Sequence, residues 1–171
     1  MLKFIGAILL TAGAALWGFT GAKSLKDRAG ALRALTASIE LMGYELCDRL
    51  TSVSDLFALL SRQAPKPACI LFQNAEERIK EIGAVPFSEL WHEAVRDTGE
   101  LMLTEKEILT LSELGFSLGK YDISQQRKAI ETARMQFADF AKKAEEERDK
   151  NWKAQAFLGV TAGLFAVIIL L

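Results

Sequence analysis

The chain has 171 residues, half of them hydrophobic, and a formal net charge of −1 at pH 7. This length accommodates one domain and little more, and the near-zero charge argues against a nucleic-acid-binding protein. Because the chain has only three prolines and is rich in Leu, Ala, Glu and Lys, its composition favours helices.

An uncharged apolar segment opens the chain at residues 4–22 (FIGAILLTAGAALWGFTGA). As a helix it would be roughly 28 Å long, close to the hydrocarbon thickness of a bilayer, so we predict an N-terminal transmembrane helix within residues 1–22. The alternative is a cleaved signal peptide, with TGA at 20–22 as its cleavage site. Positive charges directly after the segment favour an uncleaved anchor whose following domain stays in the cytoplasm. These charges are Lys23, Lys26, Arg28 and Arg33.

Apolar residues at helical spacing predict a long helix over about 24–50. Its stripe consists of Leu32, Leu35, Ile39, Met42, Leu46, Leu50 and Val53. Ser and Asp of TSVSD at 51–55 are expected to cap a short second helix. Pro67 suits the first turn of a helix over about 67–82. Pro86 helps to start another over about 86–98, which Gly99 is expected to close.

LTEKE at 103–107 has the pattern of a capping box, with Thr104 as the N-cap and Glu107 at the third helical position. The helix that follows is expected to end near Gly119, a suitable left-handed cap. A last helix is expected to start at Asp122 or Ser124. Since no proline or glycine occurs before Gly159, this helix is predicted to continue into the apolar C-terminus.

The corner between these last two helices is residues 114–126, LGFSLGKYDISQQ. Gly119 is expected to stop one helix, and Gly115 to let two helices approach closely. Gln126 is expected to bond across the corner. With no base, metal ligand or phosphate-binding loop nearby, we interpret the corner as architectural.

Residues 154–171 (AQAFLGVTAGLFAVIILL) are again uncharged and predict a C-terminal transmembrane helix. Arg148, Lys150 and Lys153 before it favour the cytoplasmic side, so both termini are expected outside. Small residues four apart are candidates for packing of the two spans on each other. They are Ala14 and Gly18 in the first span and Gly159 and Gly163 in the second.

Between the spans, residues 23–153 form roughly six helices with short links, which predicts an all-α antiparallel bundle flanked by the two transmembrane helices. Reactive chemistry is sparse. His92 is the single histidine and is expected to be a surface or partly packed residue, and Cys47 and Cys69 are expected to be small hydrophobes in a reduced core. With no phosphate-binding loop, nucleophile elbow or clustered ligands, we predict no catalytic, metal or cofactor site, and hence no enzyme.

Charge is uneven along the middle of the chain. Residues 76–113 hold ten acids and four bases, whereas residues 120–143 hold six bases and three acids. Solvated helix faces would explain this pattern. The functional interpretation is an acidic surface that meets a basic partner, with Glu89, Glu93 and Glu100 as contact candidates.

The order of these features, and above all the spacing L-G-x-x-L-G-x-x-D-x-x-x-Q, resembles the stage III sporulation protein AB family of endospore-forming bacteria over nearly the full length. The spacing is met by Leu114, Gly115, Leu118, Gly119, Asp122 and Gln126. That family is related to the F-type platform proteins of type II secretion and type IV pilus systems. The resemblance implies a subunit of the channel complex between mother cell and forespore, in the mother-cell membrane around the forespore. It also implies two kinds of neighbour, a secretion-type ATPase (stage III sporulation protein AA) and other membrane subunits.

The secretion platforms commonly hold two copies of the helical domain, whereas this chain has one. We therefore expect a second subunit to supply the other copy, in a homo-oligomer. Two alternatives stay open: a platform protein of a secretion or pilus system outside sporulation, and a membrane-anchored helical sensor domain with an apolar pocket.

Overall fold

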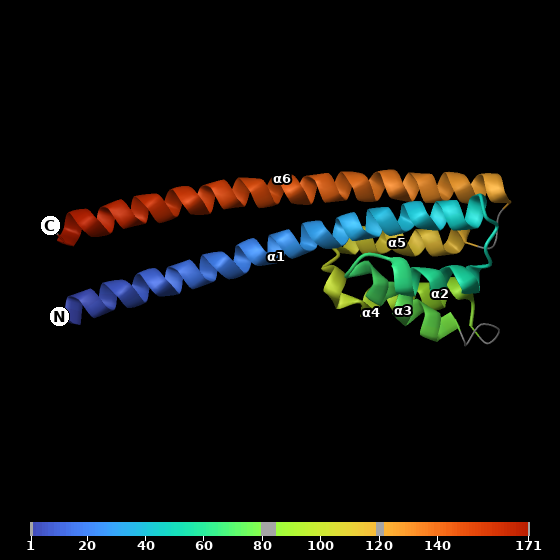
Figure 1. Cartoon of the computed structure of the whole chain (residues 1–171), viewed down its shortest axis with the longest axis horizontal. Helices are drawn as coiled ribbons and strands as arrows, with labels where there is room; N and C mark the ends of the chain where they lie inside the picture. The colour runs from blue at the N-terminus through green and yellow to red at the C-terminus, as the bar shows by residue number, and fades with distance from the viewer. Residues whose placement is uncertain (1, 80–84, 119–121, 171) are drawn as a thin grey trace. The chain divides into compact units, whose positions relative to one another are not determined.

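The structure, a computed structural model, describes residues 2–79, 85–118 and 122–170, with side chains for residues 23–79, 85–118, 122–152 and 154. Over these residues the chain is all-α, as predicted, with six α-helices and one short 3-10 helix (Figure 1). It divides into two compact units, Gly30–Lys142 and the two chain ends, Met1–Ala29 with Lys143–Leu171.

The helices follow one another with short links in the order predicted. They are α1 (Leu2–Cys47), α2 (Val53–Gln63), α3 (Ala68–Ile79), α4 (Phe87–Asp97), the 3-10 helix η1 (Gly99–Leu101), α5 (Glu105–Ser117) and α6 (Ile123–Leu170). The first and last helices are the longest, with 46 and 48 residues, and each contributes to both units.

An aromatic cluster forms the centre of the Gly30–Lys142 unit. Trp91 of α4 lies 5.3 Å from the ring of Phe57, 6.2 Å from Phe72 and 6.5 Å from Phe87, measured between ring centroids. Phe57 belongs to α2 and Phe72 to α3, so the cluster joins three consecutive helices. Such tilted and stacked ring pairs add to the stability that burial of their area provides.

Within the same unit α1 and α6 run antiparallel (Figure 1), because Gly43 meets Ile130 and Asp48 meets Arg127. Arg127 donates to the Asp48 carboxylate at 2.7 Å and to the Cys47 carbonyl at 3.2 Å, so it also covers the end of α1. A Cβ on Gly43 would lie 3.2 Å from the Ile130 side chain, which shows how closely the two helices pack.

The α1 stripe is buried as predicted from Leu32 to Leu46, but the extension to Leu50 and Val53 is wrong. The helix ends at Cys47, Leu50 has a left-handed φ of 56° and is 64% exposed, and Val53 is the first residue of α2. The buried Glu45 carboxylate accepts from Arg49 at 3.2 Å and from the Thr51 hydroxyl at 2.9 Å. These bonds turn the chain out of the helix one turn earlier than apolar spacing suggests.

Two further helix boundaries differ from prediction. Pro67 precedes α3 instead of lying in its first turn. Gly99 begins η1 instead of closing α4. At the end of α4 the Thr98 hydroxyl donates to the Ala94 carbonyl at 2.8 Å and accepts from the Asn74 amide at 2.9 Å, so a threonine ends this helix.

Most of the sequence predicted to span a membrane, residues 4–22 and 155–171, lies outside the residues whose side chains the structure describes. This includes the small residues Ala14, Gly18, Gly159 and Gly163. Among the described residues, no helix combines the length and the apolar character that a membrane crossing requires. In the unit formed by the chain ends, Arg148 pairs with Asp149 at 2.8 Å and Trp152 is 61% exposed.

Candidate functional site

A close helix contact in the Gly30–Lys142 unit lies between α4 and α5. The Trp91 indole N–H donates to the Leu111 carbonyl at 2.7 Å, and the Trp91 side chain is 1% exposed. Directly beside the ring stands Gly115, where a Cβ would lie 2.1 Å from Trp91 Cδ1. The close approach predicted at Gly115 is therefore found here, and it holds α4 and α5 as one rigid pair.

A second α4–α5 contact joins His92 Nδ1 to Ser112 Oγ at 2.8 Å. His92 is half-buried, as the sequence led us to expect, and Ser112 is buried. Sequence analysis did not pair these two residues, because they are 20 positions apart on different helices. The contact lies where α4 and α5 meet, and it fixes which residues of each helix reach solvent.

The start of α5 is set by the predicted capping box. The Glu107 carboxylate accepts from the Thr104 N–H at 2.7 Å, and the Thr104 hydroxyl accepts from the Glu107 N–H at 3.4 Å. Two of the otherwise unsatisfied N–H groups at a helix start are thereby satisfied. The prediction is confirmed, and Glu107 is buried, so it is not part of the acidic surface.

The three predicted contact acids are all exposed. Glu89 and Glu93 lie one turn apart on α4, whereas Glu100 lies in η1, beyond the end of that helix. Nearby Asp97 pairs with Arg78 of α3, which reduces its contribution to the negative surface. The structure thus exposes the three glutamates together on the α4–η1 segment without placing them in one turn.

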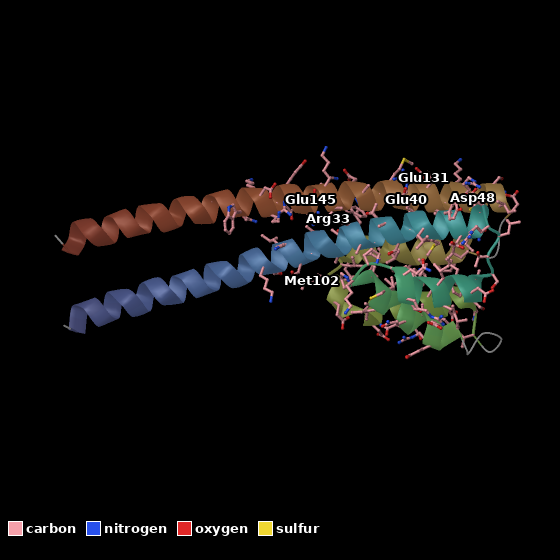
Figure 2. The ribbon with its side chains drawn as sticks, viewed as in Figure 1. Arg33, Glu40, Asp48, Met102, Glu131 and Glu145 are labelled. Atoms are coloured by element: carbon pink, nitrogen blue, oxygen red, sulfur yellow. The ribbon has the colours of Figure 1, made fainter. Side chains whose placement is uncertain are left out.

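Exposed apolar side chains in α5 and just before it were missed by sequence analysis. Met102 is 42% exposed, Leu109 57% and Phe116 51%. Met102 lies in the connection between η1 and α5 (Figure 2), with a left-handed φ of 50°. Leu109 and Phe116 are seven residues apart, two turns of α5, and therefore share one face. That spacing was the available signal, but it was masked by the stronger apolar stripe that α5 buries.

Residues of the family spacing form the corner between α5 and α6 and are mostly covered. Leu114, Gly115 and Leu118 are buried, and Gly119 lies outside the described residues. The Asp122 carboxylate accepts from the Gln125 N–H and the Ser124 hydroxyl, both at 2.8 Å, and so caps α6. These bonds, the one from Gln125 foremost, lower the pKa of Asp122 below its ordinary value.

Gln126 is 7% exposed, and its backbone N–H donates to the Asp122 carbonyl at 3.0 Å. A side-chain bond from Gln126 across the corner stays a prediction. Ile123, the first residue of α6, is 47% exposed.

An open groove of about 360 Å³ runs between α5 and α6. Seven of its ten lining residues have polar side chains, Thr110, Glu113, Ser117, Gln125, Lys128, Thr132 and Gln136, and Leu114, Ala129 and Ala133 complete it. An open groove with these polar side chains differs from the enclosed apolar pocket that the sensor-domain alternative requires.

Reactive groups in the described part of the chain do not converge. No three His, Cys, Asp or Glu side chains there are placed to hold a metal ion. Cys47 and Cys69 are free and buried, so their interpretation as small core hydrophobes is confirmed. Burial raises the pKa of the Cys47 thiol, which keeps it protonated and unreactive.

Comparisons with known proteins agree with this architecture. The family model described as stage III sporulation protein AB matches residues 3–171. Stage III sporulation protein AB of Bacillus subtilis (strain 168) is 26% identical over 172 residues and is covered in full, as is this chain. A solved structure of stage III sporulation protein AB (SpoIIIAB) aligns with a TM-score of 0.65 and 21% identity, over 72% of this chain and 98% of that one. At that identity the structural match shows a shared fold.

Proposed function

Because this chain belongs to the stage III sporulation protein AB family, we propose that it is a membrane-anchored, non-enzymatic scaffold subunit of the channel complex between mother cell and forespore. The observation that carries the proposal is the family match over residues 3–171. The all-α fold supports it, since a helical domain of this kind is suited to hold partners in a fixed geometry.

Anchoring at both ends is part of the proposal. The uncharged segments 4–22 and 154–171 are long enough to span a bilayer, and basic residues follow the first and precede the second. On this basis the helical domain, residues 23–153, faces the cytoplasm of the mother cell and both termini lie outside. The small residues Ala14, Gly18, Gly159 and Gly163 would let the spans pack on each other or on a partner.

We further propose that the helical domain contacts the secretion-type ATPase of the complex (stage III sporulation protein AA) through the exposed acids Glu89, Glu93 and Glu100. Exposure of all three supports this contact, and between Glu89 and Glu100 the sequence has a single Lys or Arg residue, Arg96. Complementary charge steers docking and fixes its register. A homo-oligomer, in which a second copy completes the arrangement, and contacts with other membrane subunits belong to the same proposal.

A deletion strain and a pull-down test the proposal at two levels. Deletion should block sporulation just after engulfment, scored by microscopy. A strain that sporulates normally but fails in secretion would instead favour a platform protein outside sporulation.

In the pull-down, the triple variant Glu89→Lys, Glu93→Lys, Glu100→Lys should retain much less ATPase than the parent chain. The control reverses three exposed acids elsewhere, Glu77, Glu146 and Glu147, with the same change in net charge. Equal retention by the two triple variants would remove the acidic surface from the proposal.

A further inference from the structure

The exposed face of the α4–α5 pair has an apolar centre. Leu109 lies in the middle of the solvent-facing side of α5 and is 57% exposed, which is unusual for a leucine on a helix that also buries an apolar stripe. Phe116, two turns further on, is 51% exposed and also keeps a contact within the protein. Met102 adds a third exposed apolar side chain just before α5.

The contact between α4 and α5 places acids beside this apolar centre. Ser112 is three residues after Leu109 and bonds to His92, so the Leu109 side of α5 borders the His92 side of α4. One turn before His92 on α4 stands Glu89, which is exposed. Because Trp91 and Gly115 lock the two helices together, this face is held in one geometry.

Acids also flank the apolar centre along α5. Glu105 and Glu113 lie four residues before and after Leu109, one turn away on each side, and both are exposed. Over residues 87–117 the chain has seven acids and two Lys or Arg residues, and five of the acids remain once the buried Glu107 and the paired Asp97 are set aside. An apolar centre with a charged rim is the usual anatomy of a protein-binding face.

We propose that the α4–α5 face, centred on Leu109, docks an amphipathic helix of a partner protein whose apolar stripe is bordered by Lys and Arg. The apolar centre calls for an apolar stripe, and the acidic rim selects basic borders. The same rim repels an anionic lipid surface, so a protein helix is favoured over the membrane. The inference rests on the proposed scaffold function and deepens it, because it states what structure the ATPase presents.

The test uses the full chain in uncharged maltoside micelles and a fluorescein-labelled 18-residue helical peptide of Leu and Lys, read by fluorescence anisotropy. A twin peptide with Glu in place of every Lys tests whether the acidic rim selects a basic peptide by its charge. Leu109→Ser removes the apolar side chain at the centre of the face. Met135→Ser is the matched control, because Met135 is an apolar residue on α6 that is 54% exposed. Empty micelles report peptide that binds detergent alone.

Leu109→Ser should weaken binding of the Lys peptide about tenfold, since roughly half of the burial of a leucine is lost. Met135→Ser should bind like the parent, and the Glu twin should not bind above empty micelles. Equal weakening by both serine variants, no weakening by either, or binding of the Glu twin would each overturn the inference. If the inference failed but the variant Glu89→Lys, Glu93→Lys, Glu100→Lys still abolished the ATPase pull-down, the proposed function would stand without the inference.

Discussion

A methyl group added at Gly115 directly tests the close packing of α5 against Trp91 of α4. Gly115→Ala would place a Cβ 2.1 Å from Cδ1, 2.7 Å from Cγ and 3.0 Å from Nε1 of Trp91. The ring would have to withdraw from 2.1 Å to about the 3.4 Å at which ordinary contact begins. It cannot easily do so, because Phe57, Phe72 and Phe87 surround it and Leu111 holds its N–H.

Three effects set the size of the change in the free energy of unfolding. Overpacking a filled core costs about 1–3 kcal/mol. Loss of the buried bond from the Trp91 N–H adds about 1–3 kcal/mol if the ring moves away from Leu111. Alanine favours a helix interior over glycine by about 1 kcal/mol, which opposes both. With the bond lost, we therefore expect a net destabilisation of about 1–5 kcal/mol.

The assay is urea unfolding of the full chain in detergent, followed by tryptophan fluorescence. Trp17→Phe and Trp152→Phe in the parent leave Trp91 as the reporter, since the chain has three tryptophans. Gly30→Ala on α1 is the matched control, because a Cβ there meets nothing within 4 Å. It should stabilise the chain by about 0.5–1 kcal/mol through helix propensity alone.

A Gly115→Ala chain as stable as Gly30→Ala would refute the reasoning, because the clash would then be absorbed without loss. An unchanged Trp91 emission in a destabilised variant would show that the ring stayed in place. The loss would then come from strain elsewhere.

Two further predictions concern the corners of the bundle. Leu50→Gly should raise stability by up to about 1 kcal/mol in the same unfolding assay, since glycine adopts the left-handed φ of 56° without strain. Leu50→Ala should bring no such gain, and an equal gain from alanine would contradict the strain explanation. Asp122 has a lowered pKa in the folded chain, so its contribution to stability is present above about pH 4 and is lost as the pH falls through the folded pKa. Asp122→Asn, which keeps a capping oxygen, should therefore flatten the loss of stability in acid, measured by unfolding from pH 6 to 3. An unchanged acid profile would show that Asp122 does not contribute.

Local signals predicted the helices well where a short stretch of chain contains its own stabilising groups. The Thr104–Glu107 capping box is such a case, because both partners lie within one turn. Ser52 likewise accepts from the Asp55 N–H and starts α2 as expected. The predictions failed where distant groups decide the boundary. Thr98 ends α4 with help from Asn74, which is 24 residues away.

For the candidate surface, too, the sequence predicted one part and tertiary contacts decided the other. Exposure of Glu89, Glu93 and Glu100 followed from their charge, because isolated carboxylates are expensive to bury. The apolar centre at Leu109 did not follow, since apolar residues are normally assigned to the core. Its exposure depends on which side of α5 meets α4, and the Trp91–Leu111 and His92–Ser112 contacts fix that side.

By itself, the sequence determined the helical class, the order of the elements, the apolar ends and the family. Periodicity, capping residues and motif spacing are properties of neighbouring residues, and the chain carries them before it folds. Only the tertiary structure decided where α1 ends, why residue 115 must lack a side chain, and which face of the α4–α5 pair remains open. Those features depend on side chains that are remote along the chain and meet only when the helices pack.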